Sequence, residues 1–182
     1  FLEEARHRGD DFGPLSWHHA VVPPLTRGRG RYRKVLRADA VLTYLRLDDG
    51  EVFVEQRFVE VDRATLSVDS LAAELASYAR LFRASDDHGE PLWRATYPAF
   101  PPVVCVLDGA PRAALERRRN ATIALLASDP ELVRTPEVSI HTCLPGDLAE
   151  QGPFAPIFRD PTRPGESLNW LGTPADPEGR SA

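Results

Sequence analysis

Two long strand-like runs separated by a short polar turn constrain the fold of this chain more than any other feature. The first run is ADAVLTYLRL, the second is EVFVEQRFVEVD, and Asp48, Asp49 and Gly50 stand between them. Glycine tolerates the positive φ values that tight turns require, so this pattern predicts a β-hairpin. The first run is apolar on both of its alternating sides, which is typical of a strand covered on two faces. We therefore expect the hairpin to lie at the centre of a sheet.

The rest of the chain alternates strand-like and helix-like segments. The run LSWHHAVV precedes the hairpin and reads as a strand. A helix is predicted from Ser67, because Leu71, Leu75, Tyr78 and Phe82 follow at helical spacing. Next come a strand in PPVVCVLD, a helix in APRAALERRRNATIALLAS and a strand in EVSIHTCL. Right-handed crossovers would place the later strands parallel to a central one, so the expected fold class is α/β, a three-layer sandwich with a mixed central sheet.

The length of the chain predicts one domain followed by an irregular extension. A chain of 182 residues fits one core of ordinary size, and we assign residues 1–150 to the α/β domain. Residues 151–182 are rich in Pro and Gly, so we expect them to form an irregular C-terminal extension that wraps the surface. The chain begins with Phe1 in what reads as the last turns of a helix, and we expect further chain before it.

Several features of the composition predict a cytoplasmic protein without membrane contact. No apolar run approaches the ~20 residues needed to cross a bilayer, and the charged start FLEEARHRGDD is unlike a secretory signal. Cys105 and Cys143 stand singly in apolar runs, as buried thiols do in a reducing compartment. The net charge of −5 argues against nonspecific nucleic-acid binding by the overall field, although local basic clusters can still bind phosphate.

One basic cluster stands just before the hairpin. The segment TRGRGRYRKVLR reads as a loop, and its candidate DNA-binding residues are Arg27, Arg29, Arg31, Arg33, Lys34 and Arg37. Guanidinium groups bind phosphate in bidentate fashion, and a loop can follow a duplex backbone. The alternative is a solvated loop whose arginines balance nearby acids. A second basic run, Arg117 to Arg119, reads as the solvent face of a helix.

Three acids should converge at one end of the hairpin. If the turn centres near residues 49–50, Asp39 faces Glu60, and Asp62 shares a face with Glu60 because strand side chains alternate with period two. Carboxylates are hard ligands that suit Mg²⁺ or Mn²⁺, so these acids are candidate catalytic and metal-binding residues, with His19 as a further candidate ligand. The alternative is that Asp39 caps the start of its strand, while Glu60 and Asp62 form ion pairs with Arg57, Arg63 or Arg37 at the end of the sheet.

Several longer runs resemble a known family. FGPLSWHHA, ADAVLTYL, FVEVDRATLSVDSLAAELASYARL, YPAFPPVVCVLDGAPRAALERR and EQGPFAPIF together resemble the replication-relaxation family of actinobacterial plasmids and integrated elements, over nearly the whole chain. The resemblance implies an N-terminal winged helix domain, absent from this chain, followed by a restriction-endonuclease-like domain similar to PD-(D/E)XK nucleases. By position, Asp39 resembles the metal-binding aspartate, and Glu60 with Asp62 resembles the E-x-K element with its lysine replaced by an acid.

The resemblance implies a DNA-associated protein of a plasmid or mobile element. Its nuclease-like domain would bind DNA and cleave phosphodiesters with a divalent metal. The departures from the pattern are Asp62, Ala20, where the related W-H-H-E motif has an acid, and Glu74, where a helix lysine would compensate. They favour an alternative, a catalytically inactive nuclease-fold module for homodimer formation or partner docking in a DNA-binding regulator. The sequence leaves both functions open.

Overall fold

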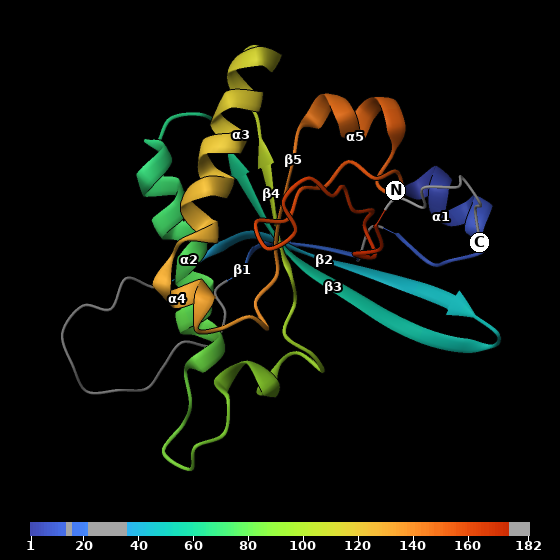
Figure 1. Cartoon of the computed structure of the whole chain (residues 1–182). Helices are drawn as coiled ribbons and strands as arrows, with labels where there is room; N and C mark the ends of the chain where they lie inside the picture. The colour runs from blue at the N-terminus through green and yellow to red at the C-terminus, as the bar shows by residue number, and fades with distance from the viewer. Residues whose placement is uncertain (14–15, 22–35, 175–182) are drawn as a thin grey trace.

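The computed structural model describes residues 1–13, 16–21 and 36–174 of the chain. Within these residues, five strands form one mixed sheet in the order β1-β2-β3-β4-β5 (Figure 1). Neighbouring strands are antiparallel from β1 to β3 and parallel from β3 to β5, so the expected mixed α/β fold is confirmed. The elements in chain order are α1 (Leu2–Arg8), β1 (Trp17–Val21), β2 (Ala38–Asp48), β3 (Glu51–Asp62), α2 (Val68–Arg83), the 3-10 helix η2 (Leu92–Ala95), β4 (Val103–Leu107), α3 (Arg112–Ala127), α4 (Pro130–Val133), β5 (Ile140–Cys143) and α5 (Pro145–Gln151).

The predicted hairpin is the centre of the sheet. Its paired residues run from Asp48 opposite Glu51 to Ala40 opposite Val59. The two turn residues, Asp49 and Gly50, have φ values of 48° and 83°. Positive φ at both central residues matches the right-handed twist of a two-stranded ribbon, which explains why Asp-Gly occupies this turn. The turn therefore fixes the register of all residues along β2 and β3.

Helices α2 and α3 cover one face of the sheet (Figure 1). α2 connects β3 to β4 and α3 connects β4 to β5, and right-handed crossovers that step in the same direction along a sheet place both helices on the same face. Ser67 caps α2, because its side chain accepts a hydrogen bond from the backbone N–H of Ser70. Leu71, Leu75 and Tyr78 of α2 pack against Phe58 of β3 in the first hydrophobic cluster.

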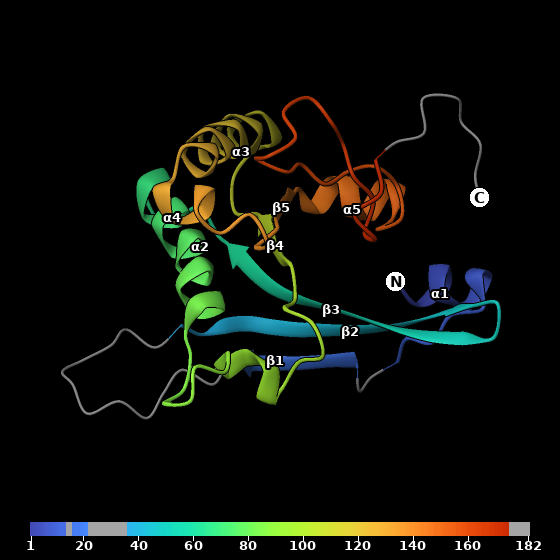
Figure 2. The same ribbon diagram turned by 60° about the horizontal axis from the view of Figure 1, so that its bottom comes forward.

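The opposite face of the sheet is covered largely by irregular chain. Ala40 and Val59 of this face pack with Phe158, Leu168 and Trp170 in a second hydrophobic cluster. The C-terminal segment is also bonded to β5, since Arg159 and Thr142 exchange two backbone hydrogen bonds of 2.9 Å. α1 and α5 lie on the same side as this segment (Figure 2). The sheet is thus enclosed between a helical layer and a layer of irregular chain with two short helices.

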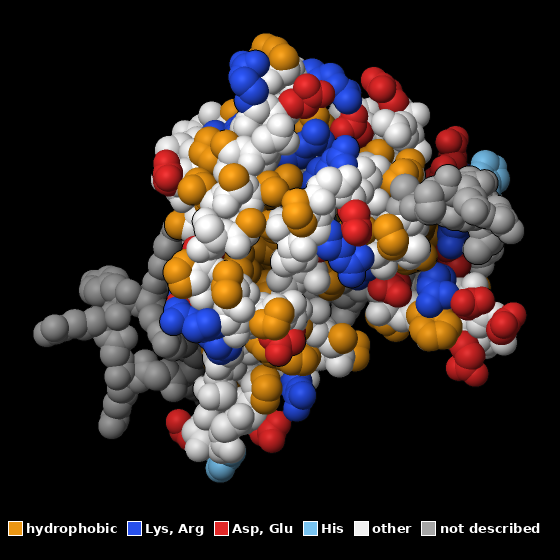
Figure 3. Space-filling model, in the orientation of Figure 1, with side chains coloured by type: hydrophobic (Ala, Val, Ile, Leu, Met, Phe, Trp, Pro, Cys, Tyr) orange, Lys and Arg blue, Asp and Glu red, His pale blue; other side chains and the backbone are white. Residues whose placement is uncertain are grey.

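The far half of the hairpin projects beyond the other strands, and we call residues 43–57 the arm (Figures 1 and 2). β1 pairs with β2 only up to Leu42, and β4 pairs with β3 only from Phe58 onward. Acidic side chains gather at the projecting tip of the arm (Figure 3). No helix in the described part of the chain has the length and apolar character that a bilayer crossing requires.

Candidate functional site

A cleft of about 480 Å³ lies at the end of the hairpin away from the arm, between the sheet and α2. Its charged lining residues are Asp39, Glu60, Asp62 and Glu74 together with Arg37 and Arg63. The cleft therefore brings together the three acids that the hairpin register predicted. We call it the acidic cleft.

Asp39 and Glu60 lie opposite each other on the two central strands. Ala40 is paired with Val59, and the next position along both strands sets Asp39 against Glu60. Directly opposed residues of an antiparallel pair share a face, which here is the face that α2 covers. Asp39 is exposed, and its Oδ2 accepts a hydrogen bond of 2.9 Å from the backbone N–H of Val61. One carboxylate thus stands at the mouth of the cleft and the other stands deeper.

Glu60 is buried beside other acids. The hydroxyl of Tyr78 donates a hydrogen bond of 2.5 Å to Oε1 of Glu60. Burial raises the pKa of Glu60 to about 7; the Tyr78 hydrogen bond opposes this shift, whereas the charges of Asp39 and Glu74 add to it. None of the ion pairs found among the described residues includes Glu60. Within the described residues, no cation therefore forms an ion pair with Glu60, although Arg37 and Arg63 line the same cleft.

Asp62 is instead closed off by Arg118 of α3. The Asp62 side chain is 1% exposed, and the Nε of Arg118 donates to its Oδ2. The Nη2 of Arg118 donates to Oδ1 of Asp62 at 3.0 Å and to the backbone carbonyl of Leu66 at 2.8 Å. The backbone N–H of Ala64 also donates to Oδ1. Both carboxylate oxygens accept hydrogen bonds from the chain itself. Asp62 therefore has a structural role in the wall of the cleft.

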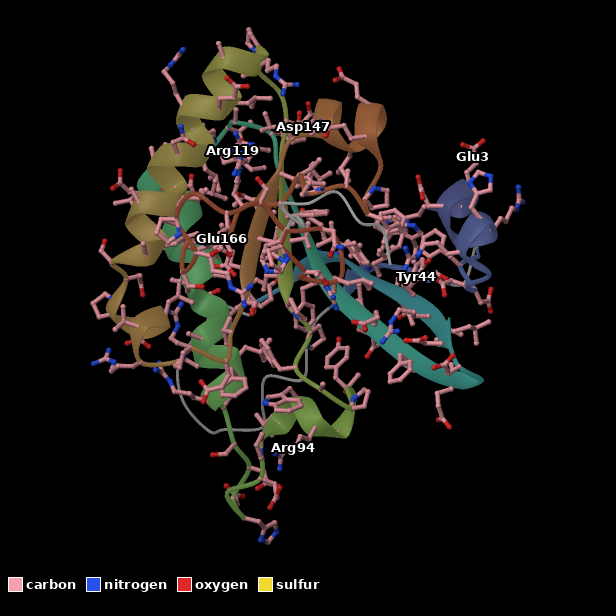
Figure 4. The ribbon with its side chains drawn as sticks, turned by 45° about the vertical axis from the view of Figure 1, so that its right-hand side comes forward. Glu3, Tyr44, Arg94, Arg119, Asp147 and Glu166 are labelled. Atoms are coloured by element: carbon pink, nitrogen blue, oxygen red, sulfur yellow. The ribbon has the colours of Figure 1, made fainter. Side chains whose placement is uncertain are left out.

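Arg118, which bonds to Asp62 of the cleft, is the residue that sequence reasoning missed. The run from Arg117 to Arg119 was predicted to be a solvent face, which is wrong for two of its members. Arg117 is exposed, but the Arg118 side chain is only 12% exposed, and Arg119 points toward Asp147 between α3 and α5 (Figure 4). Helical spacing could have indicated that these two arginines are not on the solvent face, because positions 118 and 119 fall on the same helical face as the buried Leu115 and Thr122.

His19 lies away from the acids. It is paired with Ala40, which belongs to the second hydrophobic cluster, so it is on the face of the sheet opposite to Asp39. Its ring is exposed and stacks on Trp17 with 6.1 Å between centroids. The register of β1 on β2 explains the separation, and His19 is not among the residues of the acidic cleft.

Two of the acids remain suited to a metal ion. No group of three or more His, Cys, Asp or Glu side chains in the described part of the chain is placed to hold one. This agrees with the use of Asp62 by Arg118. Asp39 and Glu60 remain as a carboxylate pair, and Mg²⁺ is commonly held by one or two carboxylates together with water and substrate phosphates. The two carboxylates therefore fit a hard divalent cation whose coordination sphere is completed by water or substrate phosphates.

Only part of the predicted basic cluster can be placed. Arg37 is exposed and lines the acidic cleft. The other predicted DNA-binding residues, Arg27, Arg29, Arg31, Arg33 and Lys34, lie outside the described residues. In β1, His19 and Val21 pair with Ala40 and Ala38, so the backbone of Ala20 stands level with Asp39.

Comparison with known proteins gives one match. A model of the replication-relaxation family matches residues 1–90 of the 182, which supports placing the chain in that family. The match is narrower than the resemblance noted in the sequence. It includes Asp39, Glu60, Asp62 and Glu74 but ends before α3, which carries Arg118. No curated protein and no solved structure matches the chain.

Proposed function

We propose that this chain is a DNA-associated protein of a plasmid or integrated mobile element, and that its acidic cleft receives the DNA backbone together with Mg²⁺ or Mn²⁺. The replication-relaxation match supports a role in replication and thus an association with DNA. The cleft supports the site, because it places exposed Arg37 beside carboxylates. Guanidinium groups bind phosphate, and carboxylates bind the hard cations that accompany phosphate.

The observation that carries this proposal is the environment of Glu60. A carboxylate that is buried beside Asp39 and Glu74, with its pKa raised to about 7, reduces the stability of the fold at neutral pH. A divalent cation between Asp39 and Glu60 would remove that penalty. The chain retains this arrangement although an apolar side chain at residue 60 would avoid it, which favours a functional role for the charge.

Each residue of the cleft has a definite part in the proposed chemistry. Asp39 and Glu60 would hold the metal ion, which would polarise a phosphoryl oxygen and lower the pKa of an attacking water. Tyr78 holds Glu60 in position through its hydrogen bond. Arg37 binds a phosphate at the mouth of the cleft. Beyond binding, we propose that the domain cleaves phosphodiesters as a nuclease does. This more specific proposal rests on the resemblance of Asp39, Glu60 and residue 62 to the PD-(D/E)XK pattern.

The second candidate function is a nuclease-fold module that binds DNA or a partner without cleaving. The observation that favours it is the pairing of Asp62 with Arg118. In the nuclease pattern this position supplies a lysine whose positive charge faces the attacking water. Here the position carries an acid, and the nearby guanidinium is already bonded to it.

Metal binding is the first test. We expect Mn²⁺ to bind the whole chain at millimolar concentration in calorimetry and Asp39→Asn to weaken this at least tenfold, or by about 1.4 kcal/mol. The matched control is Asp49→Asn, which changes an exposed acid at the hairpin turn and should bind Mn²⁺ as the unchanged chain does. Absence of binding at millimolar Mn²⁺ would leave only the second candidate.

DNA cleavage is the second test. Nicking of supercoiled plasmid with Mn²⁺ is compared between the chain and Ala20→Glu, since the backbone of residue 20 stands level with Asp39. Cutting by the Glu variant alone would identify this chain as a disabled nuclease. Cutting by both, with loss in Asp39→Asn, would establish activity, whereas DNA binding without cutting by either would support the second candidate.

A further inference from the structure

The arm has one covered edge and one bare edge. On the β2 side, Leu45 exchanges backbone hydrogen bonds of 2.9 and 3.0 Å with Asp11, and the backbone N–H of Leu47 donates to Oδ1 of Asp10. On the β3 side, pairing with β4 begins only at Phe58. Within the described part of the chain, residues 51–57 therefore have no strand beside them on that side (Figure 2).

The backbone groups along the bare edge can be identified. The N–H of Phe58 donates to the carbonyl of Pro102, on the β4 side of the strand, at 3.0 Å. In an antiparallel pair, the N–H and C=O of one residue point to the same side, and the side alternates along the strand. Val52, Val54 and Gln56 therefore direct their N–H and C=O groups outward. Such an edge is a template for pairing with another strand.

Apolar side chains of the arm are also exposed to solvent. Leu45, Leu47, Val52 and Val54 share one face of the ribbon by alternation and register. Val52 is 57% exposed and Val54 is 48% exposed. Contiguous exposed aliphatic side chains on a strand edge are uncommon on monomeric proteins and mark interaction surfaces.

Arg57, at the base of the arm, has an unused donor. Its Nη2 donates to Glu55 and to the backbone carbonyl of Trp170. Its Nε is buried and has no acceptor among the described residues. A buried donor without an acceptor costs free energy, so an acceptor supplied from outside the chain would be stabilising here.

We propose that two copies of this chain associate through antiparallel pairing of their β3 edges, with the two Val54 residues opposite each other on a two-fold axis. In this register Val52 of each copy pairs with Gln56 of the other, so all three outward-facing residues form hydrogen-bonded pairs. The same register sets Glu51 of one copy opposite Arg57 of the other, so residues of opposite charge face each other across the new edge. A two-fold axis repeats both contacts.

The dimer joins the two sheets and leaves both acidic clefts accessible. Glu60 is six residues along β3 from Val54, which is about 20 Å in an extended strand. A seven-residue edge buries less area than the ~1,600 Å² of a standard interface, so we expect association at micromolar concentration. The inference rests on the arm and does not depend on metal or DNA binding in the cleft.

The first experiment measures association of the whole chain by sedimentation equilibrium. We expect a monomer–dimer equilibrium that Val54→Lys weakens at least tenfold, because two lysines would face each other across the axis. The matched control is Val133→Lys, at a valine of α4 that is 65% exposed and far from the arm in sequence, and it should not change the equilibrium. A monomer at all concentrations, or a dimer that Val54→Lys leaves intact, would overturn the proposal.

The second experiment tests the register by oxidation. Opposed residues of a hydrogen-bonded pair have Cα atoms about 5.5 Å apart, within disulfide range, so Val54→Cys should form covalent dimers. Val52→Cys should not, because the two copies of residue 52 are offset by four positions, about 13 Å. The native Cys105 and Cys143 are buried and should not compete. Equal cross-linking of both variants, or none of Val54→Cys, would refute this pairing.

Discussion

The two ends of the acidic cleft each hold a buried carboxylate, but the two carboxylates have different hydrogen-bond partners. Glu60 and Asp62 are two residues apart on the same face of β3, and both are buried. Glu60 receives a neutral hydroxyl from Tyr78 of α2, whereas Asp62 receives a guanidinium from Arg118 of α3. At the Asp62 end the charge is matched and the oxygens are occupied. At the Glu60 end no cation is bonded to the carboxylate, and burial, together with the charges of Asp39 and Glu74, raises the pKa of the carboxyl group.

Burial alone therefore does not identify a functional acid. A buried carboxylate paired with a well-placed cation is part of the architecture, because removing either partner leaves an uncompensated charge. A buried carboxylate that lacks a cation is costly to the fold and is a stronger indication of ligand chemistry. By this criterion Glu60, together with Asp39, is the better candidate, although the hairpin pattern alone ranks Asp62 equally with them.

The largest expected effect is at the Asp62 end. Arg118→Met keeps most of the side-chain volume but leaves the Asp62 carboxylate buried without a cation, so we expect a loss of about 3–5 kcal/mol in the free energy of unfolding. Urea denaturation measures it. The control is Arg117→Met on the exposed side of α3, which should change stability by less than about 0.5 kcal/mol. Equal effects of the two variants would remove the contrast between the ends.

A smaller effect is expected at the Glu60 end, and it depends on pH. The pKa of Glu60 is raised from 4.5 to about 7 in the folded chain, so the folded state binds more protons than the unfolded state between these values. Its contribution to stability is fully present below about pH 4.5 and is lost as pH rises through about 7. Relative to Glu60→Gln, the unchanged chain should lose about 3 kcal/mol over this window.

Denaturation of both proteins at a series of pH values measures this difference. The two stability curves should separate between pH 4.5 and pH 7 and run parallel outside that window. If the two stability curves were parallel at every pH, the pKa of Glu60 would be unshifted, and the contrast between the two carboxylates would be wrong.

The smallest effect concerns Tyr78. Tyr78→Phe removes the hydroxyl that bonds Glu60, and we expect a loss of about 1–2 kcal/mol, greater when Glu60 is ionised. Loss of this donor should also move the pKa of Glu60 further upward. The midpoint of the pH-dependent stability change reports it, with Tyr97→Phe as a control at another buried tyrosine. An unchanged midpoint would show that the hydroxyl does not position the carboxylate.

The features that local rules govern could be predicted from sequence. The Asp-Gly turn fixed the register of the hairpin, and the register with period-two alternation placed Asp39 opposite Glu60. Helical spacing identified α2. The handedness of crossovers placed β4 and β5 parallel to β3. These rules act over a few residues or through chirality, so one sequence suffices for them.

Contacts between distant segments could not be predicted in this way. Arg118 meets Asp62 across 56 positions, and three consecutive arginines look alike until the packing of α3 separates them. The face that His19 occupies depends on how β1 docks on β2, which alternation within β1 does not determine. The C-terminal segment has no periodicity, yet Phe158 and Trp170 fill a core, because a few large side chains suffice for this.

The parallel pairing of β3 with β4 bears on any attempt to study the family-matched half of the chain in isolation. A fragment ending at residue 90 would lack β4 and would turn β3 from an interior strand into an edge along its whole length. Phe58 would lose its neighbours from β4, and Val59 would lose the cover of Phe158 and Trp170. We therefore expect that residues 1–90 alone would not form an autonomous folding unit, and expression should include the chain through the Trp170 region.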